Sequence, residues 1–475
     1  MSTEATADAG WSIADLEEGI ARSYQRDGRP WVLGYSGGKD STCALQMVWR
    51  AIASLPLEDR KKPVFVLSSD TLVETPVIVD YIDDTLTRIN RSAIDQNIPI
   101  TAHKVIPDVQ DSFWVNLIGR GYPAPSRRFR WCTERLKIDP ANRFIRDKVA
   151  EFGEVVMILG VRRAESTTRA QVMALHKIKG SQFSRHTRLP GALVYTPIEN
   201  LSVDDVWSYL LQTPSPWGND NRQLLALYRN AQAGECPLVV DKNTESCGNS
   251  RFGCWVCTVV TKDKAMEAMV DNGEEWLEPL LELRDFLSAT QDPERKEVVR
   301  DFRRRTGGVT FVEGRETPIP GPYLFEFRRE ILTRLLSAQK EVARDAPPGE
   351  APVLIQDEEL HEIQRIWRRE LGDWKESVYA IVQLETGREL RPDRSSTVEF
   401  SATEATLLED ICTEYDLPAG LVAELLEAER SVQGMKRRSS IHRRIASILE
   451  KEWRPKEVVI AERRARHDRS EGPPS

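Results

Sequence analysis

Residues 36–42 read Ser-Gly-Gly-Lys-Asp-Ser-Thr, and they connect a short apolar run, residues 31–35, to a helical pattern at residues 44–49. This succession predicts a strand, a tight loop and a helix in direct sequence. Gly37 and Gly38 allow positive φ and a close approach of the backbone to a ligand. The backbone N–H groups of such a loop, together with the N-terminus of the helix, form an anion site. The stretch therefore predicts a phosphate cradle.

The side chains of this loop add further phosphate-binding groups. Lys39 supplies a positive charge, and three hydroxyl groups supply hydrogen-bond donors. The spacing is not that of a Walker A loop, which requires G-x-x-x-x-G-K-[ST]. The predicted nucleotide-binding residues of the loop are Ser36, Gly37, Gly38, Lys39, Asp40, Ser41 and Thr42.

Strand and helix signals alternate through the first half of the chain. After the first strand, further strands are predicted at residues 63–70, 98–106, 154–161 and 193–198, and a helix at residues 77–93. This alternation predicts an α/β fold with a parallel sheet that helices cover on both faces. Ligands of such folds bind at the carboxyl ends of the strands.

Three more candidate nucleotide-binding residues lie at predicted strand ends. Asp70 can hold a ribose hydroxyl or a metal ion, or it can belong to a helix cap that Thr75 would serve equally well. Gly160 allows close approach of a ligand. Arg162 can bind a phosphate with two hydrogen bonds, the alternative being a solvent-exposed arginine.

Four of the seven cysteines fall in one short segment with the spacing C-x10-C-x6-C-x2-C, namely Cys236, Cys247, Cys254 and Cys257. Four thiolates without a neighbouring histidine suit an iron–sulfur cluster or a structural zinc ion, and the spacing does not choose between them. A disulfide is disfavoured because nothing else in the sequence indicates an oxidising compartment. Cys43 and Cys412 lie among apolar residues and are predicted to pack in cores.

Cys132 lies in a segment, residues 126–137, that alternates arginines with Phe129 and Trp131. Arginine and aromatic side chains can pair with phosphates and stack on bases. Nearby cations are expected to lower the pKa of the Cys132 thiol and so favour the thiolate that carries or receives sulfur. Two alternatives remain: Cys132 is a small buried residue at a helix start, or it replaces Cys236 as a cluster ligand.

Length and charge limit the remaining possibilities. The 475 residues suggest three regions, 1–211, 212–345 and 353–475, with the Pro- and Gly-containing residues 346–352 as a linker. Residues 212–262 are expected to be poor in regular structure, and the polar, basic tail after Arg454 is expected to fray. The net charge of −8 restricts contact with nucleic acid to local basic patches, such as residues 303–305 and the C-terminal arginines. No secretory signal and no apolar run of membrane-spanning length is found, which predicts a cytoplasmic protein.

The motifs at residues 36–42, 70–76, 160–169 and 201–207 resemble the phosphoadenosine-phosphosulfate reductase group of PP-loop ATP pyrophosphatases, over about residues 30–210. The stretch from Cys247 to Cys257, Cys-Gly-Asn-Ser-Arg-Phe-Gly-Cys-Trp-Val-Cys, resembles the DndC family of bacterial DNA phosphorothioation, or the related SspD family. The resemblance implies a parallel-sheet PP-loop domain like that of the adenine nucleotide alpha hydrolases, followed by a cysteine-rich cluster segment and a C-terminal helical region.

The same resemblance implies a reaction and its components. ATP with Mg²⁺ adenylylates a DNA backbone phosphate, pyrophosphate is released, and sulfur then replaces a non-bridging oxygen. The implied partners are DNA, a cysteine desulfurase as sulfur donor, and other subunits of a phosphorothioation complex. A [4Fe-4S] cluster would be held by the four clustered cysteines. The implied catalytic residues are Cys132, Lys39, Asp40 and Arg162.

Other reactions and roles remain open from the sequence. They are reduction of an activated sulfate nucleotide, thiolation of a tRNA base, and a zinc-stabilised scaffold that only senses ATP. A sulfate reductase needs no large helical extension, and a tRNA thiolase is expected to carry a more basic surface.

Overall fold

The computed structural model describes residues 12–163, 181–186, 188–231, 253–312, 315–391, 400–430, 432 and 439–470. The chain forms two compact units. Unit 1 comprises residues 1–107 and 131–275, and unit 2 comprises residues 108–130 and 276–475. The three regions expected from the sequence stay a prediction.

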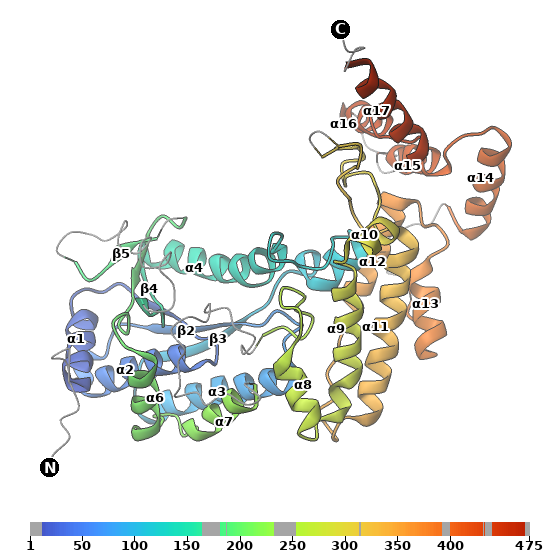
Figure 1. Ribbon diagram of the computed structural model, residues 1–475. Helices are drawn as coiled ribbons and strands as arrows, with labels where there is room; N and C mark the ends of the chain where they lie inside the picture. Colours follow the sequence, from blue (N-terminus) through green and yellow to red (C-terminus); the bar gives the residue numbers. More distant parts are fainter. Residues whose placement is uncertain are drawn as a thin grey trace, which may run out of the picture. The chain divides into compact units, whose positions relative to one another are not determined.

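Unit 1 is built on a six-stranded sheet with the order β3-β2-β1-β4-β6-β5 (Figure 1). Every described neighbouring pair is parallel except β5 with β6. The predicted α/β fold with a parallel sheet is therefore confirmed. The strands are β1 (Trp31–Gly34), β2 (Val64–Ser69), β3 (Ile100–Val105), β4 (Val155–Ile158), β5 (Ser184–Arg185) and β6 (Ala192–Tyr195).

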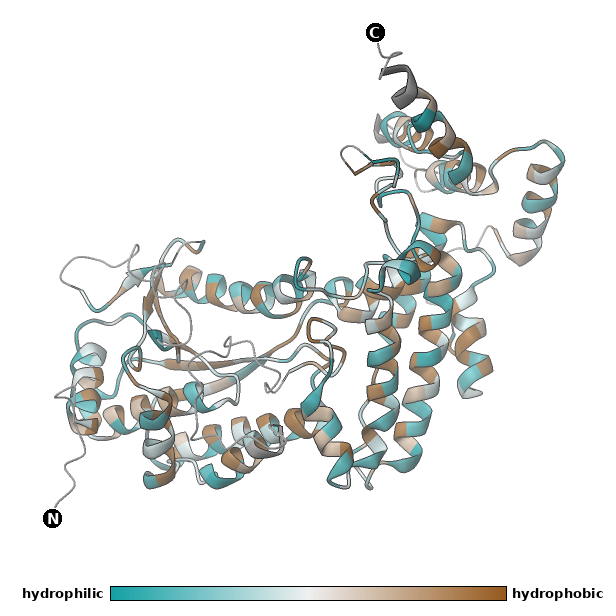
Figure 2. Cartoon of the chain, viewed as in Figure 1, coloured by the Kyte–Doolittle hydropathy of each residue, from teal (hydrophilic) through white to brown (hydrophobic). Residues whose placement is uncertain are grey.

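Helices cover both faces of this sheet, as alternation along the strands requires. In β1, Trp31 and Leu33 pack into the core beneath α1, α2, α3 and α6, whereas Val32 packs on the opposite face with Ile145 of α4. Figure 2 shows predominantly apolar strands, while the helices alternate apolar and polar residues along their length. The helices of unit 1 are α1 (Ile13–Gln25), α2 (Lys39–Ala53), α3 (Pro76–Asp95), α4 (Asp139–Phe152), α6 (Val203–Gln212), α7 (Asn221–Ala231) and α8 (Lys264–Asp271).

One expectation for unit 1 is wrong. Residues 212–262 were expected to be poor in regular structure, yet residues 221–231 form the helix α7. Leu224 of this helix is buried in the main core, and Tyr228 packs against that core. The buried side-chain amide of Asn221, the first residue of α7, donates hydrogen bonds to the carbonyls of Leu210 and Thr213. Tertiary contacts therefore stabilise a helix whose own apolar pattern is short.

Unit 2 is predominantly helical in its described residues, which confirms the predicted helical C-terminal region. Its longest helix, α11, buries Ile331 and Leu335, and the indole of Trp367 in α12 donates a hydrogen bond of 2.9 Å to the carbonyl of Ile118. The helices are α9 (Glu278–Ala289), α10 (Pro293–Val299), α11 (Phe325–Asp345), α12 (Asp357–Leu371), α13 (Ser377–Thr386), α14 (Ala402–Glu414), α15 (Ala419–Arg430), α16 (Ser439–Leu449) and α17 (Lys456–Ser470).

The C-terminal segment differs from its expectation. The tail after Arg454 was expected to fray, but residues 456–470 form the helix α17. Val459 is 7% exposed, and Arg464 forms an ion pair of 2.6 Å with Glu316. These contacts hold a polar segment that has little helical patterning of its own. None of the helices in the described ranges is long and apolar enough to cross a membrane.

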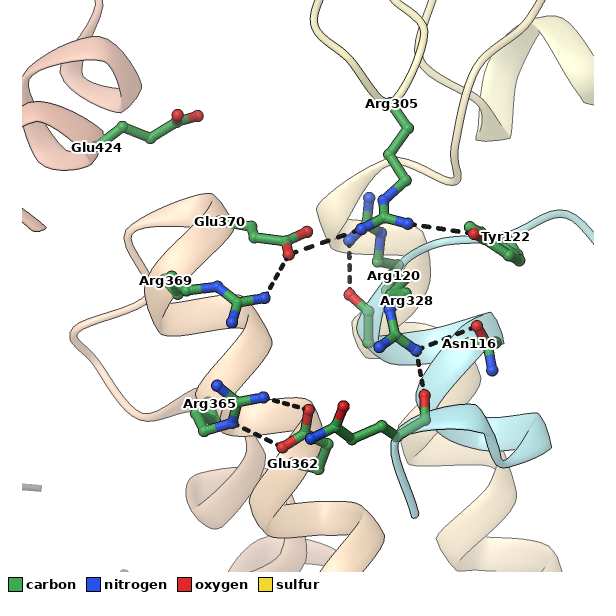
Figure 3. Close-up of polar contacts among 12 residues, drawn as sticks. Asn116, Arg120, Tyr122, Arg305, Arg328, Glu362, Arg365, Arg369, Glu370 and Glu424 are labelled. Carbon is green, nitrogen blue, oxygen red and sulfur yellow. Dashed lines mark hydrogen bonds and ion pairs between the residues drawn. The ribbon is translucent and has the colours of Figure 1, made fainter. Parts of the chain in front are cut away.

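The basic patch at residues 303–305 makes polar contacts within unit 2, and Figure 3 shows those of Arg305. Arg303 pairs with Asp301 at 2.8 Å, and Arg305 donates to the Tyr122 hydroxyl at 3.1 Å and lies 3.8 Å from Glu370. These contacts engage the arginines within the fold. Contact between this patch and DNA stays a prediction. Cys43 and Cys412 are both buried, so their predicted place in cores is confirmed.

Replacing Lys62 with methionine is expected to stabilise the protein by about 1–2 kcal/mol at neutral pH. Lys62 is 6% exposed, with its Nζ 3.6 Å from Asp27 and over the rings of Tyr24 and Trp31. Burial lowers the pKa of Lys62 from 10.5 to about 8. Below pH 8 the folded protein must bury the charged ammonium. Above pH 8 the folded protein loses this proton before the unfolded chain does, so wild-type stability rises with pH.

The measurement is urea unfolding of both proteins at about pH 7 and about pH 9.5. The advantage of Lys62→Met is expected to shrink at the higher pH. Lys61→Met, at the exposed neighbouring position, is the control and is expected to change stability little. A loss of stability in Lys62→Met at neutral pH would show that the ring and Asp27 contacts outweigh the cost of burial.

Candidate nucleotide-binding site

The predicted phosphate cradle lies at the carboxyl end of β1. The helix α2 begins at Lys39 directly after the loop, with Gly38 at its N-cap position. Gly37 has φ +71°, and a Cβ there would lie 3.1 Å from the Ile82 side chain, so glycine is favoured at this position. The Ser41 hydroxyl donates to the carbonyl of Gly38 at 2.9 Å and accepts from the N–H of Ser36 at 3.2 Å. The loop is thereby closed on itself, with the positive end of α2 facing it.

The strand order brings a second predicted element to the cradle. β1 pairs with β2 on one side and with β4 on the other, so the loops after β1 and β4 leave neighbouring strand ends. Ligands of open α/β sheets bind at such a point of reversal. Gly160 follows β4, and a Cβ at Gly160 would lie 2.7 Å from the carbonyl oxygen of Asp40 and 2.8 Å from the nitrogen of Ser41. Only glycine lets the two segments approach this closely.

A charged trio lies at the start of α2. Asp40 accepts from Arg162 Nε at 2.6 Å and from Lys39 Nζ at 2.9 Å. The Arg162 side chain is 3% exposed, so it is not the solvent-exposed arginine of the alternative interpretation. In this structure its guanidinium is directed at Asp40. The trio carries two positive charges and one negative charge, which suits a polyphosphate ligand.

The Asp70 side chain stabilises the turn after β2. It accepts from the N–H of Leu72 at 2.8 Å, and its other oxygen lies 3.4 Å from Lys104 Nζ. Leu72 has φ 63°, a conformation that this hydrogen bond helps to hold. Thr75 occupies the N-cap position of α3 without a side-chain capping bond. Asp70 therefore does not cap α3, and its proposed contact with ribose or a metal ion stays a prediction.

The loop has one neighbour that the sequence did not reveal. Tyr228 of α7 accepts a hydrogen bond of 3.2 Å from the N–H of Lys39, and the Lys39 ammonium lies 5.4 Å from the centre of its ring. The only signal available in the sequence was an aromatic residue four positions after the apolar Leu224. Because that region was assigned as irregular, the signal was missed.

Cys254 and Cys257, the last two cysteines of the predicted cluster segment, lie on a tight turn. The N–H of Cys257 donates to the carbonyl of Cys254 at 3.0 Å. Two backbone contacts join the turn to the segment after β2. Cys254 forms an antiparallel β-bridge with Glu74, and the N–H of Trp255 donates a hydrogen bond of 3.0 Å to the carbonyl of Val73. Trp255 is 2% exposed and fixes the turn in the core of unit 1.

Polar and charged groups surround the Cys254 thiol. Its sulfur lies 3.3 Å from the Thr71 hydroxyl and 3.6 Å from Glu74 Oε1, and the same carboxylate oxygen lies 3.1 Å from Lys137 Nζ. Burial raises the pKa of Cys254, and the charge of Glu74 adds to this. The charge of Cys254 in turn raises the pKa of Lys137, despite the opposing effect of burial.

Cys132 lies close enough to this turn to interact with it electrostatically, but the expected effect on its thiol is wrong. Burial and the nearby Cys257 raise the pKa of Cys132 above its ordinary value, and the opposing effect of Lys137 is smaller. Within the described part of the chain, no arginine is among the main groups that shift this pKa, and burial, which disfavours the thiolate, has the largest effect.

Two of the predicted metal ligands, Cys236 and Cys247, lie outside the described residues. Within the described ranges, no group of three or more histidine, cysteine or acidic residues is arranged to hold a metal ion. Cys254 and Cys257 are thus placed on one turn, with Cys132 as a near neighbour. A complete ligand set stays a prediction.

Two regions of the chain match known families. Residues 30–260 match the phosphoadenosine phosphosulfate reductase domain, and residues 403–450 match a small protein found in certain Dnd DNA modification systems. An uncharacterized protein of Methanocaldococcus jannaschii is 26% identical over 198 residues, which are 42% of this chain and 35% of that protein. The chain thus spans about a third of that relative's length.

Two solved structures also show similarity. The phosphoadenylyl-sulfate reductase from Candida auris, in complex with phosphate, is 15% identical with a TM-score of 0.28, over 47% of this chain and 95% of that chain. The FMN adenylyltransferase from Candida glabrata, in complex with FAD and inorganic pyrophosphate, is 14% identical with a TM-score of 0.25, over 47% of this chain and 65% of that chain. The reductase-domain match includes the residue 36–42 loop, and the Dnd-system match spans α15, α16 and most of α14.

Proposed function

We propose that this protein is the ATP pyrophosphatase and sulfurtransferase of a DNA phosphorothioation system. The observation that carries the proposal is the combination of two features in one chain: a phosphate cradle in unit 1 and the match of residues 403–450 to a Dnd-system protein. The cysteine turn at Cys254 and Cys257, packed within the same unit as the cradle, supports the sulfur chemistry.

The reaction begins with activation of the DNA backbone. A non-bridging oxygen of a phosphodiester attacks the α-phosphorus of ATP, and the bond to the β-phosphate breaks. Pyrophosphate leaves, and AMP becomes a leaving group on the DNA phosphorus. A persulfide sulfur then displaces AMP, and a second thiol releases the persulfide carrier as a disulfide. The phosphorothioate remains on the DNA.

The residues of the cradle have separate roles in this proposal. The N–H groups at the start of α2 and the Lys39 ammonium bind the departing pyrophosphate and stabilise its charge. Arg162, buried against Asp40, fixes the first turn of α2 and adds positive charge beside it. Asp70 is the candidate carboxylate ligand of Mg²⁺, which would offset the negative charge of the phosphates when it is bound. Cys132 is the candidate residue that carries or receives the sulfur.

The cysteine donors fit a thiolate-held metal group. Two thiols on a tight turn and a third within electrostatic reach, with no histidine among them, are donors that iron–sulfur clusters and zinc both accept. A [4Fe-4S] cluster would use Cys254 and Cys257 together with Cys236 and Cys247, or with Cys132 in place of Cys236. Such a cluster supplies electron transfer or a sulfur-binding iron when it is bound.

Replacing Cys254 with alanine is expected to remove the metal group. Wild-type protein purified without oxygen is expected to contain about four irons and four sulfides, with broad absorption near 400 nm. The variant is expected to lose this absorption because one ligand of the turn is gone. Cys412→Ala, at a buried cysteine of unit 2, is the control and is expected to keep its iron. One zinc ion in a colourless wild-type protein would contradict the cluster.

The function itself is tested on DNA. The full chain is expressed together with a cysteine desulfurase and the other subunits of its system, and the nuclease-digested DNA is examined by mass spectrometry for sulfur-containing dinucleotides. Wild type is expected to produce them, and Lys39→Ala to reduce them at least a hundredfold, in line with loss of charge stabilisation at a transferring phosphate. Lys61→Ala, at an exposed site, is the control. DNA without sulfur in the wild-type sample would contradict the proposal.

The match of residues 30–260 favours one alternative, reduction of phosphoadenosine phosphosulfate. In that case sulfite would form from the activated sulfate nucleotide and a thiol reductant, with no DNA present. Sulfite production by the purified chain at the rate of DNA-dependent ATP cleavage, or faster, would favour this second function.

A further inference from the structure

Tyr228 lies where the cradle would hold a phosphate oxygen. Its hydroxyl oxygen accepts from the N–H of Lys39 at 3.2 Å. That N–H is at the first turn of α2, where the N–H groups have no partner within the helix and are free to bind an anion. A Cβ at Gly38 would lie 3.1 Å from the same hydroxyl, so the phenol sits directly against the glycines of the loop.

The ring of Tyr228 is held by two further contacts. Its centre lies 5.2 Å from the ring of Trp207 in an edge-to-face arrangement, and 5.4 Å from the ammonium of Lys39. The same ammonium is 2.9 Å from the carboxylate of Asp40. Both anion-binding groups of Lys39, the backbone N–H and the ammonium, are therefore in contact with Tyr228.

We propose that Tyr228 is a displaceable occupant of the phosphate cradle, which the pyrophosphate moiety of a nucleotide must move aside. The inference rests on the proposed nucleotide-binding function. One N–H cannot donate a full hydrogen bond to a phenol and to a phosphate oxygen at once. The phosphate oxygen carries the greater negative charge and forms the stronger bond, so it displaces the phenol.

Displacement of the Tyr228 hydroxyl would change how α7 packs on the loop. Tyr228 lies in the last turn of this helix, which ends at Ala231. Loss of its contact with the loop is therefore expected to loosen the end of α7.

The test is Tyr228→Phe in the full chain, which keeps the ring and removes the hydroxyl. Binding of inorganic pyrophosphate and of Mg·ATP is measured by calorimetry. Because the hydroxyl no longer competes for the Lys39 N–H, both ligands are expected to bind about two- to tenfold more tightly than to wild type. Tyr379→Phe is the matched control: it also removes a hydrogen-bonded phenolic hydroxyl, one that lies 3.1 Å from His361 in unit 2, and it is expected to leave both affinities unchanged.

Hydrogen exchange of α7 gives a second readout. Pyrophosphate is expected to speed the exchange of residues 221–231 in wild type, because the helix loses its contact with the loop. Unchanged affinity in Tyr228→Phe would overturn the inference, as would weaker binding with slower exchange in α7, which would make Tyr228 a direct ligand of the phosphates. If wild type binds neither pyrophosphate nor Mg·ATP, the proposed nucleotide site itself fails, and the inference fails with it.

Discussion

Replacing Gly160 with alanine is expected to weaken pyrophosphate binding at the residue 36–42 loop at least tenfold and to lower the free energy of unfolding by about 2–3 kcal/mol. The added Cβ would lie 2.7 Å from the carbonyl oxygen of Asp40 and 2.8 Å from the nitrogen of Ser41. These are backbone atoms of the first turn of α2, and they cannot rotate away as a side chain can. Either α2 or the segment after β4 must shift, and the cradle shifts with it.

The measurements are calorimetry with pyrophosphate and urea unfolding. Gly19→Ala is the matched control, because Gly19 lies within α1 and a Cβ there would meet nothing within 4 Å. Alanine is the better helix former, so this control is expected to bind normally and to gain up to about 1 kcal/mol of stability. Wild-type affinity in Gly160→Ala would mean that the close approach of β4 to α2 does not shape the cradle.

Replacing Asp40 with alanine is expected to cost about 3 kcal/mol of stability, because it leaves the buried guanidinium of Arg162 without its carboxylate. The two groups lie 2.6 Å apart, and the Arg162 side chain is 3% exposed. In the double variant Asp40→Ala with Arg162→Met, the buried charge is gone as well. Most of the lost stability is expected to return, while nucleotide binding stays impaired.

This separation of stability from binding is the informative result. Urea unfolding of the two single variants and the double variant gives the coupling energy of the pair. Asp84→Ala is the control, since Asp84 pairs with Arg88 at 2.7 Å on an exposed face, where such pairs contribute little. A double variant as unstable as Asp40→Ala would show that the loss comes from the loop and not from the missing ion pair between Asp40 and Arg162.

The strands in the core of unit 1 could be predicted because each is specified by the pattern of its own residues. The apolar run before Ser36 and the β-branched run at residues 63–70 specify buried strands. The parallel direction of the strands follows from their alternation with helices. Gly160 could be recognised as a point of close approach. The identity of the approaching atoms, those of Asp40 and Ser41, depends on which strands are neighbours, and the sequence pattern does not specify that order.

The parts that failed depend on contacts between segments that are distant in the sequence. The pKa of Cys132 was judged from neighbouring arginines, but burial and Cys257, more than a hundred positions away, have the larger effect. The predicted contact of Arg162 with a phosphate stays a prediction, but its ion pair with Asp40 was not foreseen from the sequence. Tyr228 became part of the site because α7 packs on the loop, which brings together residues 189 positions apart in the sequence.

The most direct test of the proposed function is the fate of ATP labelled at the α-phosphate, incubated with the full chain, Mg²⁺ and DNA. We expect the label to appear as AMP, free or attached to DNA, with an equal amount of pyrophosphate. We also expect this cleavage to depend on DNA and to be lost in Lys39→Ala. ADP and inorganic phosphate as products, or equal cleavage with and without DNA, would contradict the assignment of this protein as a PP-loop enzyme that activates DNA for sulfur transfer.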